Sequence, residues 1–160
     1  MWSGGNDPES AEKGVTRTRP ASAVFVGTAR DCAGWLPDVL ANLAKLSRLY
    51  DRAAFIFVVS DATDATAQLL RDWMGTERAG KVVNLGELAG RFQRRTERIA
   101  FARNVCLEEV RGSAFAEYRH LVVADMDDVL AAPLDVDSYV RALQWLDTAP
   151  DRAAVFASAS

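Results

Sequence analysis

Short apolar runs recur along the chain from residue 21 onward, and segments with a helical pattern lie between them. Four of the runs predict strands, at residues 23–26, 54–59, 81–85 and 121–124. The second run is apolar on both faces, which is typical of a central strand in a parallel sheet. A further apolar run at residues 153–159 predicts a fifth strand.

The segments between and after these runs carry apolar residues at helical spacing, which predicts four helices. The second helix begins after Thr63 or Asp64, which are good capping residues, and ends at Gly75. The other bounds follow from the apolar spacing: residues 36–50 for the first helix, 91–111 for the third, stopped by Gly112, and 136–146 for the fourth. Three tryptophans fall at core positions of these helices and are expected to pack in the interior: Trp35, Trp73 and Trp145.

Strands that alternate with helices predict an α/β fold with three layers, in which a mainly parallel sheet carries helices on both faces, as in Rossmann-like nucleotide-binding domains. The pattern assigns residues 21–160 to one such domain and residues 1–20, which lack apolar periodicity, to a disordered leader. Ligands of such sheets bind at the carboxyl ends of the strands. Polar clusters follow three predicted strands there, at residues 28–31, 60–64 and 125–128.

Composition narrows the class of protein without indicating an activity. The 160 residues suffice for one domain, and a net charge of −3 argues against general nucleic-acid binding. No apolar run approaches the roughly 18–20 residues of a membrane span, and the N-terminus lacks the pattern of a secretory signal. We therefore expect a cytoplasmic protein without a transmembrane segment, with a peripheral association with the membrane left open. Cys32 and Cys106 are expected to be reduced, buried thiols, and His120 to have a surface or structural role.

Three carboxylates, Asp125, Asp127 and Asp128, follow the fourth predicted strand within four positions. Such a cluster repels itself unless a divalent cation or solvent neutralises it. Mn²⁺ and Mg²⁺ suit this pattern, because one or two carboxylates hold them together with water and phosphate oxygens. The alternative interpretation is a solvated turn or a helix cap.

Charge is unevenly distributed around this cluster. Six arginines and three glutamates lie between residues 91 and 111, whereas residues 121–151 hold seven aspartates and one arginine. This arrangement can place a cation and a phosphate side by side. Arg91, Arg95 and Arg98 share one helix face, where they either reach phosphate or form a solvated surface.

The polar motifs resemble those of glycosyltransferases of the GT-A fold. The second strand ends in Ser60-Asp61-Ala62-Thr63-Asp64, the long helix carries Ala102-Arg103-Asn104, and the fourth strand leads into Asp125-Met126-Asp127. The resemblance extends from residue 23 to about residue 160. It implies a metal-dependent enzyme of polysaccharide biosynthesis that binds a nucleoside-diphosphate sugar and transfers the sugar to a glycan or lipid-linked acceptor.

The resemblance also implies which residues contact the nucleotide. Thr28, Arg30 and Asp31 would lie along the base and ribose. Asp61 would accept a hydrogen bond from the base, and Arg103 would flank it.

For the metal, the resemblance implies a role for each carboxylate of the cluster. Asp125 would contact the ribose or the metal, and Asp127 would bind the metal that bridges the two phosphates. Asp128 would be a further ligand or a water-bridged neighbour. No catalytic base is assigned.

Two other functions remain open at this point. Residues 121–130 are also similar to the first motif of haloacid dehalogenase-like phosphatases, in which Asp125 would be the nucleophile and Asp127 the general acid. Only 32 residues follow Asp128, however, whereas the later motifs of that family need a hundred or more. A non-catalytic nucleotide-binding domain is the third alternative. Domains of the GT-A fold usually exceed this length as well, so we expect the domain to be incomplete at its C-terminal end.

Overall fold

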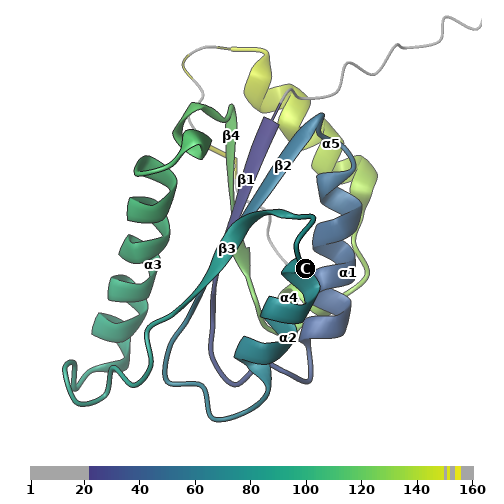
Figure 1. The fold of residues 1–160 in the computed structure, drawn as a ribbon. Helices are drawn as coiled ribbons and strands as arrows, with labels where there is room; N and C mark the ends of the chain where they lie inside the picture. The colour runs from purple at the N-terminus through teal and green to yellow at the C-terminus, as the bar shows by residue number, and fades with distance from the viewer. Residues whose placement is uncertain (1–21, 150, 152–153, 156–160) are drawn as a thin grey trace, which may run out of the picture.

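The computed structural model describes residues 22–149, 151, 154 and 155, in which strands and helices alternate as predicted (Figure 1). The predicted leader at residues 1–20 lies outside the described residues. So does the predicted strand at 153–159, apart from Ala154 and Val155, which are exposed and belong to no strand. The elements in chain order are β1 (Ser22–Ala29), α1 (Leu36–Ser47), β2 (Arg52–Val59), α2 (Thr66–Met74), β3 (Ala79–Asn84), α3 (Arg95–Arg111), the short 3-10 helix η1 (Ala114–Glu117), β4 (His120–Asp125), α4 (Asp128–Ala131) and α5 (Val136–Asp147).

The strands of the described chain form one parallel sheet in the order β3-β2-β1-β4. β1 is central, since it pairs with β2 on one side and with β4 on the other. The predicted end of this strand at Gly27 is too early. Gly27 pairs with Phe57 on β2 and with Ala124 on β4, and the strand therefore continues to Ala29.

Helices cover both faces of the sheet, which confirms the predicted layered α/β fold (Figure 1). On one face, Phe25 and Phe57 pack in an apolar cluster to which α1, α2 and α5 contribute. On the other face, Val26 and Ile56 pack with Ala102 and Cys106 of α3. Because successive strand residues point to opposite faces, the continuous apolar runs of β1 and β2 supply both clusters.

Two helix starts differ from the prediction. α3 begins at Arg95 instead of residue 91, because the side chain of Glu97 accepts the N–H of Arg94 there and caps the first turn. α2 has Ala65 at its N-cap, but the predicted capping residue Asp64 still accepts the N–H of Thr66 at 2.9 Å. The predicted helix ends at Gly75 and Gly112 are confirmed.

The tryptophans are only partly in the interior. Trp73 packs against Phe55 and Phe57 at ring-centroid distances of 4.9 and 6.0 Å, as expected. Trp35 and Trp145 are half-exposed, so their predicted core positions are wrong. Trp35 lies at the N-cap of α1, before the buried helix face begins. Trp145 lies two residues after the buried Leu143 and therefore on another side of α5.

A buried histidine joins the start of β4 to the end of α5. His120 is buried, and its Nε2 lies 3.1 Å from Asp147 Oδ1 at the end of α5. Arg119 donates to the same oxygen at 2.8 Å. Burial opposes these bonds, but on balance they keep the pKa of Asp147 below its usual range. His120 therefore has a structural role away from the carboxyl ends of the strands.

None of the helices in the described part of the chain is long and apolar enough to cross a membrane.

Candidate functional site

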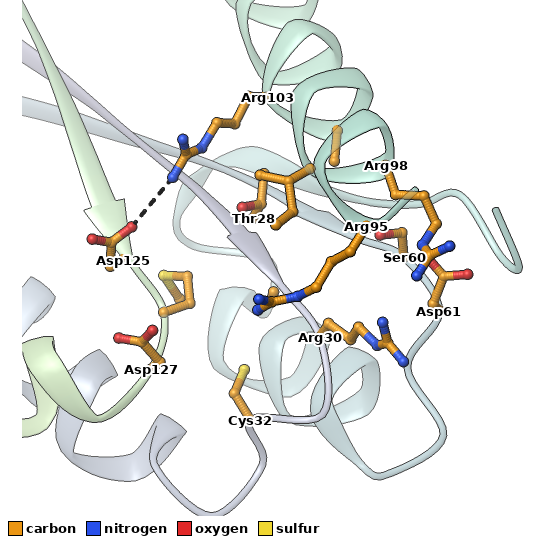
Figure 2. Close-up of a pocket in the computed structure, with 14 residues that line it drawn as sticks. Thr28, Arg30, Cys32, Ser60, Asp61, Arg95, Arg98, Arg103, Asp125 and Asp127 are labelled. Carbon is orange, nitrogen blue, oxygen red and sulfur yellow. Dashed lines mark ion pairs between the residues drawn. The ribbon is translucent and has the colours of Figure 1, made fainter. Parts of the chain in front are cut away.

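A cavity of about 190 Å³ opens at the carboxyl ends of β1, β2 and β4 (Figure 2). We call it the strand-end cavity. The first turns of α3 form its remaining wall. The lining contains two groups of charged residues and three small polar ones. The acidic group is Asp61, Asp125 and Asp127, and the basic group is Arg30, Arg95, Arg98 and Arg103. The small polar residues are Thr28, Cys32 and Ser60.

The sheet order explains why the cavity forms there. The chain moves outward from β1 through β2 to β3, and then crosses back to place β4 on the other side of β1. The helix that returns the chain to β4, α3, therefore covers the face of the sheet opposite to α1 and α2, and the cavity lies between the first turns of α3 and the strand ends. In open α/β sheets, this switch point is where ligands bind.

The acidic wall of the cavity comes from the end of β4. Asp125 is the register partner of Thr28, and its side chain is 63% exposed. Asp127 caps α4 by accepting the N–H of Val129 at 3.3 Å. The intervening Met126 is buried directly beneath Gly27, where an added Cβ would lie 2.6 Å from the methionine sulfur. The interior thus anchors the residue between the two carboxylates.

The third carboxylate of the cluster lies apart from the other two. Asp128 is the first residue of α4 and does not border the cavity. Within the described residues, no three acidic, histidine or cysteine side chains converge closely enough to hold a metal ion. Asp125 and Asp127 remain as candidate metal ligands. Two carboxylates on one wall suit Mg²⁺ or Mn²⁺, which take one or two protein carboxylates and complete their shell with water and phosphate oxygens. The donor set therefore fits such a cation.

The basic wall comes mainly from α3. Arg103 faces Asp125 across the cavity, with Nη2 and Oδ1 3.7 Å apart. Arg95 points into the cavity and makes no hydrogen bond or ion pair with any other described residue (Figure 2). Arg30 borders the cavity from the loop after β1, and among the described residues its side chain forms an ion pair with the neighbouring Asp31 alone, at 3.4 Å. Arginine carries its charge at every physiological pH, so this wall offers permanent cations to an anion.

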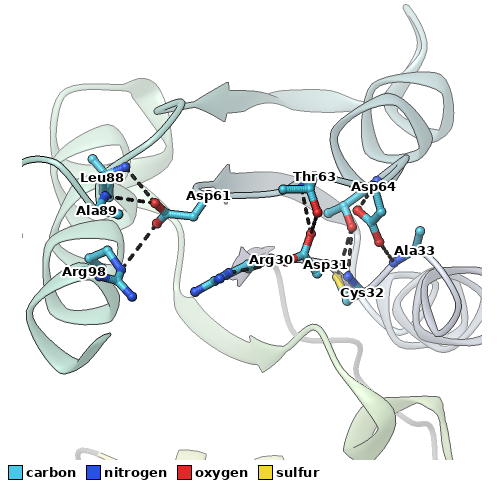
Figure 3. Close-up of polar contacts among 11 residues, drawn as sticks. Arg30, Asp31, Cys32, Ala33, Asp61, Thr63, Asp64, Leu88, Ala89 and Arg98 are labelled. Carbon is cyan, nitrogen blue, oxygen red and sulfur yellow. Dashed lines mark hydrogen bonds and ion pairs between the residues drawn. The ribbon is translucent and has the colours of Figure 1, made fainter. Parts of the chain in front are cut away.

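Asp61 has an anchoring role that the sequence did not predict. Its Oδ1 accepts the N–H groups of Leu88 and Ala89 at 2.8 and 3.1 Å, which fixes the loop between β3 and α3 (Figure 3). Its Oδ2 lies 3.6 Å from Arg98 Nε. The side chain is only 8% exposed, and Oδ2 has no hydrogen-bond partner. Oδ1 therefore holds the loop, whereas Oδ2 can still accept a hydrogen bond.

Asp31 lies next to the cavity but does not border it. Its Oδ1 accepts the backbone N–H and the hydroxyl of Thr63 at 2.7 and 3.1 Å (Figure 3). Asp64 makes the reverse connection by accepting the N–H of Ala33 at 3.0 Å. These bonds tie the loop after β1 to the loop after β2. The hydrogen bonds from Thr63 lower the pKa of Asp31, so the tie is made by an ionised carboxylate.

Both cysteines are buried thiols near the site, as expected. Cys32 borders the strand-end cavity, and burial raises its pKa. Cys106 borders an adjoining apolar hollow beside β4, and burial raises its pKa to about 11. The thiolate is the reactive form of cysteine, so neither residue is an activated nucleophile at neutral pH.

The structure thus brings together most of the residues that the sequence predicted as site residues. Thr28, Arg30, Asp61, Arg103, Asp125 and Asp127 border one cavity, whereas Asp31 and Asp128 do not. Arg95 and Arg98 join the site. Arg98 and Arg103 follow Arg95 by three and eight residues, and this spacing was the signal in the sequence, since it places the three arginines on adjoining faces of one helix.

Comparisons with protein-family models, with curated proteins and with solved structures found no match to the chain. Inferences about its function therefore start from the geometry of the cavity and the chemistry of its lining.

Proposed function

We propose that the chain is the donor-binding part of a metal-dependent glycosyltransferase of the GT-A type. The strand-end cavity would bind a nucleoside-diphosphate sugar together with Mn²⁺ or Mg²⁺. The observation that carries this proposal is the division of the cavity into two charged walls. Asp125 and Asp127 offer two carboxylates to a cation, and Arg95 faces them with a charge that no other described residue neutralises.

A diphosphate ligand makes use of both walls at once. Its oxygens complete the coordination shell of a divalent cation and also accept charge-assisted hydrogen bonds from guanidinium groups. A nucleoside adds N–H and O–H donors, for which Asp61 Oδ2 is the unused buried acceptor in the lining. Arg98 faces this oxygen at 3.6 Å without a hydrogen bond, so a ligand that donates a hydrogen bond to it gains affinity.

The same arrangement suits transfer of the sugar. When the bond between the anomeric carbon and the phosphate oxygen breaks, the electron pair leaves with the nucleoside diphosphate, which becomes more negative. A bound divalent cation stabilises that charge as a Lewis acid. Arg95 and Arg103 stabilise it further, because their charges are already held in the cavity before the reaction begins.

The acceptor in this proposal is a glycan or a lipid-linked saccharide, and the site of action is the cytoplasm or the adjoining membrane surface. The choice of acceptor rests on the resemblance to GT-A glycosyltransferases, and the site of action is the expectation drawn from the hydropathy of the sequence.

Isothermal titration calorimetry tests the donor site. We expect a nucleoside diphosphate such as UDP or GDP to bind at least about tenfold more tightly with Mn²⁺ than with chelator. Asp127→Asn should remove most of this metal dependence. Asp128→Asn is the matched control, because the same chemical change lies outside the cavity. Equal nucleotide affinity with Mn²⁺ and with chelator would contradict the proposal.

Two further outcomes separate the alternatives. Hydrolysis of a phosphomonoester that Asp125→Asn abolishes would favour the phosphatase instead. Metal-dependent nucleotide binding without hydrolysis or transfer of any donor sugar would favour a non-catalytic binding domain.

A further inference from the structure

We infer that Arg103 competes with the divalent cation for Asp125, and that this competition couples cation binding to anion binding in the strand-end cavity. The inference rests on the proposed function, because it takes the cation and the phosphate groups as ligands of one cavity. The observation behind it is the ion pair between Arg103 Nη2 and Asp125 Oδ1 at 3.7 Å, which is marked in Figure 2. Arg103 thus lies beside the carboxylate that a cation would use.

The ion pair between Arg103 and Asp125 is held weakly and can separate. The two side chains are 58% and 63% exposed, and a single contact joins them. No other hydrogen bond or ion pair holds the side chain of Arg103 among the described residues. Exposed pairs of this kind are weak, because water solvates both partners when they part.

Arg98, five residues earlier on the same helix, is held quite differently. Its Nη1 donates to the carbonyl oxygens of Phe92 and Gln93 at 2.9 and 3.2 Å, and its Nε faces the buried Asp61. Its side chain is 16% exposed. Arg98 is therefore a fixed part of the wall, whereas Arg103 is free to change partners.

A cation and Arg103 exclude each other at Asp125. Mg²⁺ binds carboxylate oxygens at about 2.0–2.1 Å, and Mn²⁺ takes the same oxygen ligands. With the guanidinium still 3.7 Å from the same oxygen, two positive groups would lie within a distance at which like charges repel strongly. In the absence of an anion, the cation therefore has to displace Arg103 into water.

An anion in the cavity removes this obstacle. Phosphate oxygens accept paired hydrogen bonds from a guanidinium group, and Arg103 borders the same cavity that the phosphates would enter. A bound diphosphate therefore draws Arg103 away from Asp125 and leaves the carboxylate to the cation. Because coupling between two ligands is reciprocal, the bound cation raises the affinity for the diphosphate by the same factor.

Titration of Mn²⁺, followed by the electron paramagnetic resonance signal of the free ion, tests this directly. Mn²⁺ affinity is measured with and without UDP for the wild-type chain and for Arg103→Gln. The variant removes the competing charge, so it should bind Mn²⁺ alone about 2- to 5-fold more tightly than the wild type, which is the range that an exposed ion pair supplies. The factor by which UDP increases Mn²⁺ affinity should fall by a similar amount, since couplings between sites are typically about 5-fold or larger.

Arg111→Gln is the matched control. Arg111 lies on the same helix, beyond the cavity, and within the described part of the chain its side chain forms an ion pair only with Glu108, at 4.0 Å. The Arg111→Gln variant has the same change in net charge as Arg103→Gln, and we expect its Mn²⁺ affinities to equal those of the wild type. Both arginines are more than half exposed, so both variants should melt like the wild type.

The outcomes separate this inference from the proposed function. If the wild type binds Mn²⁺ and UDP cooperatively but Arg103→Gln binds Mn²⁺ alone no more tightly, the competition is refuted and the donor site stands. If Arg111→Gln gains as much as Arg103→Gln, the effect is one of net charge and the inference is also refuted. If Mn²⁺ binds neither chain, with UDP or without it, the proposed metal site itself is wrong.

Discussion

The carboxylate of Asp61 offers the sharpest test of how the site is held together. Asp61→Asn keeps the size and shape of the side chain and one carbonyl oxygen for Leu88 and Ala89, but it removes the negative charge that faces Arg98. The backbone at this position has a φ of 51°, which asparagine adopts at least as readily as aspartate. Any loss of stability therefore reports the charge and not the backbone.

The expected loss follows from burial. Asp61 is 8% and Arg98 is 16% exposed. Removal of one partner of a buried ion pair costs about 3–5 kcal/mol, because the remaining charge is left uncompensated. Arg98 keeps its two bonds to backbone carbonyl oxygens, so we expect the lower end of this range, about 3 kcal/mol. For a domain of this size the midpoint of thermal unfolding should fall by about 6–12 °C.

Asp31→Asn is the matched control, measured by urea unfolding alongside Asp61→Asn. Asp31 also follows a strand, has a φ of 46° and accepts two hydrogen bonds, yet its side chain is exposed. Its loss of stability should be a small fraction of that of Asp61→Asn. Equal losses in the two variants would refute the reasoning, since burial of the pair with Arg98 would then have no effect on stability.

Two further predictions concern the loops and the acidic wall. The lowered pKa of Asp31 means that its ionised form favours the folded state at pH values above the unfolded pKa of about 3.9, and that this contribution is lost as the pH falls toward the folded pKa. Asp31→Asn should therefore reduce the fall in stability below about pH 4 in urea unfolding at a series of pH values, and an unchanged acid profile would contradict this. Gly27→Ala places a Cβ 2.6 Å from the sulfur of Met126 and should weaken Mn²⁺-dependent nucleotide binding in calorimetry by displacing the chain between Asp125 and Asp127. Gly34→Ala, whose Cβ meets no atom within 4 Å, should bind like the wild type, and equal behaviour of the two variants would show that Met126 does not set the carboxylate positions.

The layered fold could be predicted because its signals are local. The apolar run of β2 and the apolar spacing of α1 each lie within a dozen neighbouring residues. The predictions were wrong at positions whose place in the fold is set by packing and not by the local sequence. Gly27 resembles a strand end in the sequence, but its place between Phe57 and Ala124 keeps it inside the sheet. Trp35 resembles a core residue, but the buried face of α1 begins one position later.

The candidate site was predictable only as far as the strand ends determine it. Asp125 and Asp61 follow strands, so parallel pairing brings them to the same edge of the sheet. The roles of these aspartates depend on partners that are distant in sequence, such as the loop residues Leu88 and Ala89 for Asp61. No local pattern distinguishes a carboxylate that anchors a loop from one that faces a ligand.

The sheet order also has a consequence for the time course of folding. During synthesis, β1, β2 and β3 leave the ribosome with the helices between them and can pair at once, since each neighbours the strand next to it in sequence. β4 is the last strand of the described chain, and it cannot pair with β1 until α3 and η1 have been synthesised. Thr28 and Asp125 become neighbours only in that last step. Nascent chains would thus contain an ordered three-stranded sheet without the proposed cation site, and acquisition of Mn²⁺ affinity would report that β4 has joined the sheet.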